Sequence, residues 1–137
     1  MRRIFWDTNL FIYLIEKNPV FYDKVHQLRL DILEKKDELI TSTLTLAELL
    51  VLPLRSGNRG LADSYRNIFY SGAITIIPLD IPVAELTAKI RADFQIKTPD
   101  AIQLASAAYK KVNIFYAHDR GLWKKKISDI DEIRGLE

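Results

Sequence analysis

The chain has 137 residues, and its 20 Lys and Arg residues nearly balance 18 Asp and Glu residues, which leaves a net charge of +2. It contains no cysteine, which excludes a disulfide framework, a cysteine-based zinc site and a thiol nucleophile. No apolar run approaches the roughly 20 residues that cross a bilayer, and no signal-peptide core follows Met1. We therefore expect a single domain over residues 1–137, in the cytoplasm and without membrane contact.

Short apolar or β-branched runs alternate with longer amphipathic stretches along the sequence. The expected strands, in chain order, are residues 2–6, 39–41, 73–79, 113–117 and 130–136. The expected helices begin at Asp7 or Thr8, then span residues 20–36, 43–54, 60–70 and 82–94, and a last one opens with Thr98 as its N-cap. This alternation predicts a three-layer α/β/α domain with a mainly parallel central sheet of four to five strands.

Four carboxylates lie where an expected strand gives way to a helix, or in the first turns of a helix: Asp7, Glu48, Asp100 and Asp119. In an open parallel sheet such positions share one rim, where ligands bind. Like charges gathered there repel one another unless a cation neutralises them. Mg²⁺ or Mn²⁺ fits this set, because these hard cations take oxygen ligands and need no His or Cys.

Each acid also has a local explanation. Asp7 can cap the first helix, and Glu48 forms the capping-box spacing with Thr45. Asp100 lies in a first helical turn, where the helix dipole favours a carboxylate, and Asp119 can be a turn residue. Capping accounts for each acid separately, whereas a metal site accounts for all four together.

Four segments resemble, in type and order, the acidic motifs of PIN-domain ribonucleases, and among them the VapC-type toxins of toxin–antitoxin pairs. They are Asp7-Thr8-Asn9, residues 43–49 around Glu48, residues 98–107 around Asp100, and Asp119 after the fourth strand. The resemblance covers essentially the whole chain. It implies that Asp7, Glu48, Asp100 and Asp119 are the catalytic, Mg²⁺- or Mn²⁺-binding residues of an endoribonuclease, a phosphodiester hydrolase, with Thr8 and Asn9 orienting Asp7. Relatives commonly carry Thr-Asn or Ser-Asn before the fourth acid, whereas this chain has Ala117-His118, and we leave His118 outside the metal site.

RNA approaches an acidic site only when basic residues surround it, because phosphate contacts dominate nucleic-acid affinity. The candidates flanking the expected rim are Arg55, Arg59, Lys97, Arg120 and Lys124. For Lys124 and the two lysines after it, a solvated helix end or loop is the simpler interpretation.

The leading hypothesis is the ribonuclease toxin of a two-gene module, neutralised by a small antitoxin and assembled as a homodimer. Two alternatives share the fold: an RNA-processing nuclease outside any toxin pair, and an inactive module that binds RNA or protein. Two other folds are disfavoured. A haloacid-dehalogenase-type phosphatase needs a second Asp where Asn9 stands, and a response-regulator receiver needs an acidic pair where Trp6-Asp7 stands.

Overall fold

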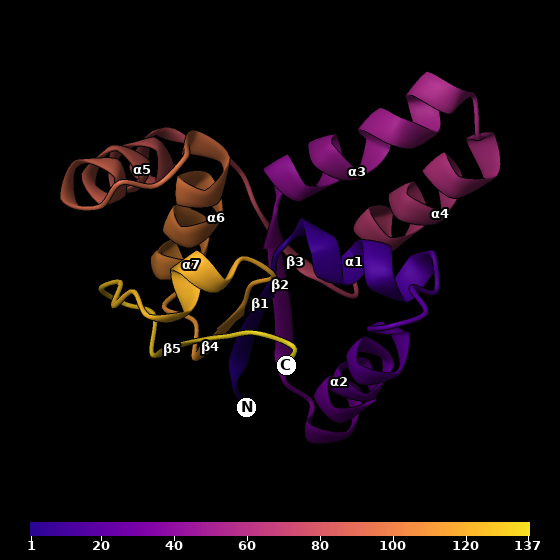
Figure 1. Ribbon diagram of the computed structural model, residues 1–137, viewed down its shortest axis with the longest axis horizontal. Helices are drawn as coiled ribbons and strands as arrows, with labels where there is room; N and C mark the ends of the chain where they lie inside the picture. The colour runs from indigo at the N-terminus through magenta and orange to yellow at the C-terminus, as the bar shows by residue number, and fades with distance from the viewer.

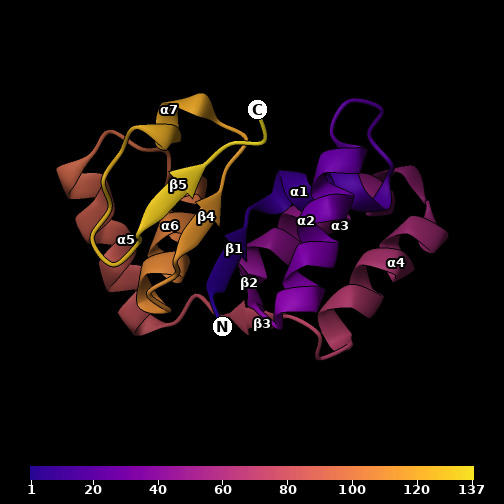
Figure 2. The same ribbon diagram turned by 90° about the horizontal axis from the view of Figure 1, so that it is seen from below.

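The computed structural model describes all residues 1–137, arranged around one five-stranded sheet (Figure 1). Its strands are β1 (Arg3–Trp6), β2 (Glu38–Ser42), β3 (Thr75–Ile77), β4 (Ile114–Tyr116) and β5 (Glu132–Arg134). They lie in the order β3-β2-β1-β4-β5, and every neighbouring pair is parallel. Figure 2 shows the strands side by side in this order. The predicted mainly parallel sheet is confirmed.

The strand order places a topological switch point between β1 and β4. The chain adds β2 and then β3 on one side of β1, and later returns to add β4 and β5 on the other. Ligand sites of open parallel sheets lie at the carboxyl ends of the strands at such a point. Asp7 follows β1 directly, and Asp119 comes three residues after the end of β4, so these two acids flank the switch point.

Helices cover both faces of the sheet, as the α/β pattern predicts (Figure 1). One face carries α5 (Ile81–Asp93) and α6 (Thr98–Tyr109). The other carries α1 (Thr8–Ile15), α2 (Tyr22–Lys35), α3 (Thr43–Ser56) and α4 (Arg59–Tyr70). A short seventh helix, α7 (Arg120–Trp123), follows β4. No helix is long and apolar enough to span a membrane.

The alternation of side chains along β1 builds a separate core on each face. Phe5 points to the α5–α6 side, where it stacks on Phe115 with ring centroids 4.9 Å apart. Ile4 and Trp6 point to the other side and pack with the buried residues of α1 to α4. The sheet is thus buried on both faces along its centre, which makes the strand ends a rigid platform for side chains placed there.

Several element ends differ from the sequence-based expectation. The helix expected to open with Thr98 as N-cap has Lys97 in that position instead, and Thr98 is its first helical residue. The expected capping box of Thr45 with Glu48 is wrong, because α3 begins earlier and Ser42 is its N-cap. Strand β3 is shorter than expected, since Pro78 follows it and has no N–H to donate to a ladder.

Candidate active site

Asp7 is the N-cap of α1, and its carboxylate is oriented by backbone groups from two elements. Its Oδ1 accepts a hydrogen bond of 3.2 Å from the Asn9 N–H, and its Oδ2 accepts one of 3.2 Å from the His118 N–H. Burial nevertheless raises the pKa of Asp7 to about 7, and the nearby charge of Asp100 adds to the rise. Asp7 therefore both caps α1 and belongs to the group of predicted site acids.

The other three acids lie close enough for their charges to interact. Asp100 lies half-buried in the first turn of α6. Burial raises its pKa first, and the charges of Asp119 and Glu48 raise it further, while Lys97 lowers it. Together with the effect of Asp100 on Asp7, these couplings link all four predicted acids into one electrostatic cluster.

The exposed side chain of Glu48 is held by Thr8, which belongs to a network of polar side chains whose other members are buried. The Thr8 hydroxyl donates to Glu48 Oε1 at 2.6 Å, so its partner is Glu48 and not Asp7 as expected. The side-chain amide of Gln103 donates to the Thr45 hydroxyl at 2.8 Å and to the Thr8 hydroxyl at 3.4 Å. Ser42 donates in turn to the Gln103 carbonyl oxygen.

This network joins three elements that deliver acids. Gln103 lies one turn after Asp100 on α6, Thr45 lies one turn before Glu48 on α3, and Thr8 follows Asp7. Gln103 is 4% exposed and Thr45 is fully buried, so each needs a partner inside the protein. One sign of this network was visible in the sequence, because Gln103 is a polar residue on the apolar face of the Ala-rich helix α6.

Asp119 is placed differently, as the N-cap of α7. Its Oδ1 accepts a 2.8 Å hydrogen bond from the Gly121 N–H, and its side chain is exposed. The helix itself is anchored by Trp123, whose Nε1 donates to the Ala117 carbonyl at 2.9 Å. The Ala117-His118 departure from the family pattern thus leaves Asp119 with a backbone partner from its own helix.

The rings beside the acids serve packing. Tyr13 donates its hydroxyl proton to His118 Nδ1 or receives one from it at 2.7 Å, and the His118 ring also packs edge-on against Phe21. The Asn9 side chain makes no hydrogen bond to Asp7; its backbone N–H does so instead. The expected orienting role of Asn9 therefore belongs to its main chain.

The five predicted basic residues fall into two groups. Lys97 lies beside Asp100, and Arg120 follows Asp119 but forms an ion pair with Glu137. Lys124 ends α7 and lines a different hollow, with Lys126 and Ile130. Arg55 and Arg59 lie at the turn between α3 and α4, about 10 Å beyond Glu48 along the α3 axis. Lys125, which the sequence analysis did not single out, lines a cavity of about 220 Å³ together with Lys97, Asp100 and Asp119.

The donor chemistry of the cluster suits a hard divalent cation. The four predicted acids supply only carboxylate oxygens, and their mutual repulsion is the condition that a cation relieves. No three His, Cys, Asp or Glu side chains lie close enough to form a preformed metal cage. An ion held directly by two carboxylates and otherwise by water requires no such cage, because Mg²⁺ usually retains several waters.

Comparison with models of known protein families shows which family this chain belongs to. The family model of the PIN domain matches residues 4–127, which is most of the chain. The chain belongs to the PIN domain family. The resemblance inferred from the four acidic segments is thereby confirmed, and so is the fold class.

Solved structures similar to this PIN domain come from toxin–antitoxin systems. VapBC2 from Rickettsia felis, bound to a DNA fragment from its promoter, has a TM-score of 0.73 and 20% identity, covering 97% of this chain and 98% of that one. VapC20 from Mycobacterium tuberculosis, a Sarcin-Ricin loop cleaving toxin, has a TM-score of 0.69 and 19% identity, covering 85% and 90%. DNA-bound VapBC from Salmonella typhimurium has a TM-score of 0.67 and 19% identity, covering 99% of both chains. At this identity the likeness establishes the fold. Comparison with curated proteins gave no match.

Proposed function

We propose that this PIN domain is a Mg²⁺- or Mn²⁺-dependent endoribonuclease and the toxin of a toxin–antitoxin pair. The observation that carries the proposal is the electrostatic coupling of Asp7, Glu48, Asp100 and Asp119 at the switch point of the sheet. The proteins it resembles in fold support the choice of substrate, since VapC20 is a Sarcin-Ricin loop cleaving toxin.

In this proposal the two half-buried acids, Asp7 and Asp100, hold the principal ion, and Glu48 and Asp119 bind it through water or hold a second ion. A bound divalent cation polarises a phosphodiester oxygen and lowers the pKa of water, which supplies a nucleophile near neutral pH. The backbone N–H groups of Asn9 and His118 keep the Asp7 carboxylate aimed at the rim. Thr8 does the same for Glu48.

The residues around the acids suit an approaching polyanion. Lys97 and Lys125 line the cavity beside Asp100 and Asp119, where their charges offset those of the acids. Arg120 and Lys124 stand on the adjacent helix α7. We assign phosphate binding next to the bond that is cleaved to these side chains, because cations near a carboxylate cluster are needed to offset its repulsion of RNA.

A protein partner is part of the same proposal. Two of the similar structures are VapBC complexes, which supports an antitoxin as partner. Helices α3 and α4 also expose large apolar side chains, Val51, Leu52, Leu54 and Tyr70, of which Tyr70 is 81% exposed. Exposed apolar side chains of this kind mark surfaces that bind another protein. Here that protein is an antitoxin segment or a second copy of the chain in a homodimer. Growth arrest on expression, relieved by co-expressing a small reading frame found beside the gene, tests the toxin assignment.

The activity is tested by incubating the purified protein and RNA with Mn²⁺ or Mg²⁺, with and without a chelator. The parent should cleave only with the metal, and Asp7→Asn should lose more than about a hundredfold in rate, since changes to outer partners of a metal site alone cost about 10–100-fold. Asp93→Asn, at an exposed position on α5, is the matched control and should cleave as the parent does. If Asp7→Asn cleaves RNA as fast as the parent does, the assignment of Asp7 to the active site is wrong.

A further inference from the structure

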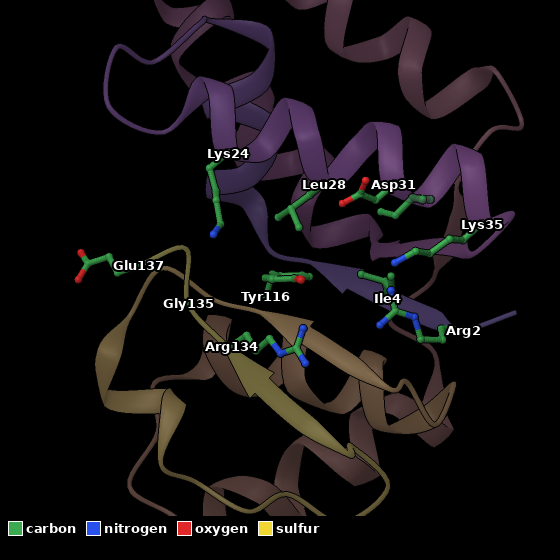
Figure 3. A pocket seen from close by; sticks show the side chains of 11 residues that line it. Arg2, Ile4, Lys24, Leu28, Asp31, Lys35, Tyr116, Arg134, Gly135 and Glu137 are labelled. Carbon is green, nitrogen blue, oxygen red and sulfur yellow. The ribbon is translucent and has the colours of Figure 1, made fainter.

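A second, basic groove lies away from the acids, on the face of the sheet that carries α1 to α4. Helix α2 covers β1 on this face but stops short of β4 and β5, and the space between them is a groove of about 430 Å³ (Figure 3). Ile4 and Tyr116 form its floor, and Leu28 on α2 adds an apolar wall. The cations around this floor are Arg2, Lys24, Lys35 and Arg134.

The two lysines of the basic groove are free to bind a ligand. Lys24 and Lys35 lie on the same side of α2 as Leu28, extend over the floor in Figure 3, and form no ion pair. Of the two acids that line the groove, Glu137 pairs with Arg120. Asp31 accepts a 2.9 Å hydrogen bond from the neutral amide of Gln27 and keeps its charge, so the cations of the groove outnumber its acids. Unpaired cations above an apolar floor are the chemistry that recognises a nucleoside phosphate.

One end of the basic groove neighbours the acidic rim. Tyr116, in its floor, is the last residue of β4, and its carbonyl oxygen accepts a 3.3 Å hydrogen bond from the Asp7 N–H. Glu137, at the same end of the groove, pairs with Arg120, the residue after Asp119. The end of the groove that holds Tyr116 and Glu137 is therefore the end that neighbours the rim.

We propose that the basic groove binds the backbone of a single-stranded RNA segment that flanks the bond cleaved at the rim. The inference rests on the proposed function. The backbone positions of Lys24 and Lys35 are separated by about 16 Å along the helix axis, a length over which an extended strand presents more than one phosphate. An extended strand with successive phosphates fits this spacing better than a free mononucleotide does.

The test measures binding of fluorescent RNA by anisotropy in the presence of chelator, so that no cleavage occurs. A short oligonucleotide, long enough only for the rim, is compared with a longer one across a series of salt concentrations. The parent should bind the longer RNA more tightly. The double variant Lys24→Gln/Lys35→Gln should lose that gain, and its salt dependence should fall by about one phosphate contact for each lysine.

The control is Lys89→Gln/Lys111→Gln, which removes the same charge from exposed positions on α5 and after α6. We call Lys24→Gln/Lys35→Gln the groove variant. The proposal is overturned if the salt dependence of RNA binding is unchanged in the groove variant, or if it falls equally in the control. Adenosine monophosphate is the competing ligand. If it binds through the two lysines as tightly as the longer RNA, the groove is a mononucleotide site and the strand proposal is wrong.

Cleavage with Mn²⁺ separates the two proposals. A parent that binds RNA through Lys24 and Lys35 but cleaves none supports the basic groove and contradicts the proposed function. A parent that cleaves RNA, while the groove variant binds the longer RNA as tightly as the parent, overturns the basic groove alone. Cleavage of the short oligonucleotide should be equal in the parent and the groove variant, because the short RNA does not reach the lysines.

Discussion

On the side of the rim formed by α3 and α6, Glu48 is held by Thr8, which bonds to the buried amide of Gln103. On the side formed by β4 and α7, Asp119 stands exposed on a four-residue helix and accepts one hydrogen bond from Gly121. The first side is ordered by the folding of the core, because its network is buried between three elements. The second carries its carboxylate on a short helix outside that network. We call the two the fixed side and the adjustable side.

The largest effect is expected from breaking the fixed side with Gln103→Leu. The change leaves the Ser42 and Thr45 hydroxyls with fewer partners in a buried place, which should lower the free energy of unfolding by about 2–4 kcal/mol. Because Thr8 then loses its second partner, Glu48 is less well oriented, and Mn²⁺ affinity should fall by about 10–100-fold. Urea unfolding and metal titration measure both.

Gln27→Leu, at an exposed position of α2, is the control for Gln103→Leu and should change the free energy of unfolding by less than about 0.5 kcal/mol. If Gln103→Leu matches the parent in both stability and Mn²⁺ affinity, the network does not order the site.

The next effect is a pH dependence that Asp7 imposes on the metal-free protein. Its folded pKa of about 7 lies above the unfolded value of 3.8, so the native state holds the proton more tightly. Asp7 therefore contributes most to the stability of the folded state below pH 4, and this contribution is lost as the pH rises towards 7. Asp7→Asn removes the charge, so its free energy of unfolding in chelator should exceed that of the parent by about 2–4 kcal/mol above pH 8, and by little below pH 4.

Unfolding of both proteins in chelator across this pH range measures the difference, with Asp93→Asn as the exposed control. A gain of the same size at both ends of the range would mean that the substitution acts through packing and not through the ionisation of Asp7.

A smaller effect is expected on the adjustable side from Gly135→Ala. A Cβ at this position would lie 1.9 Å from Cζ2 of Trp123, the residue that anchors α7. Overpacking of this kind costs about 1–3 kcal/mol. Mn²⁺ affinity should fall less than in Gln103→Leu, because Glu48 and Asp7 keep their partners.

Gly60→Ala is the control for Gly135→Ala: the new methyl group would meet only one atom, at 3.8 Å, and should stabilise α4 slightly. A larger loss of Mn²⁺ affinity in Gly135→Ala than in Gln103→Leu would reverse the comparison between the two sides of the rim.

Apart from the short helix α7, the strands and helices could be predicted because their signals are local. Apolar runs marked each strand, and the four acids could be proposed as a group because the carboxyl ends of parallel strands meet. Gln103 could not be assigned a role, since its partners Thr45 and Thr8 are 58 and 95 residues away in sequence. A capping box was the local alternative for Thr45 because that spacing is visible in the sequence, whereas its actual partner comes from another helix.

The basic groove was also beyond prediction from sequence. Lys24 and Lys35 are ordinary exposed positions of a helix until β5 is known to leave the space beside α2 uncovered. Charged side chains acquire a shared function through tertiary placement, which no local pattern records. The acids could be found because strand ends fix their place, and the lysines could not because a helix surface does not.

The most direct test is the position of manganese in crystals of the protein soaked in Mn²⁺, located by its anomalous scattering. We predict one strong peak between the carboxylates of Asp7 and Asp100, with Glu48 and Asp119 near it, and its loss in Asp100→Asn. A peak elsewhere on the surface, or none at a concentration that supports RNA cleavage, would contradict the assignment of the four acids to one metal site.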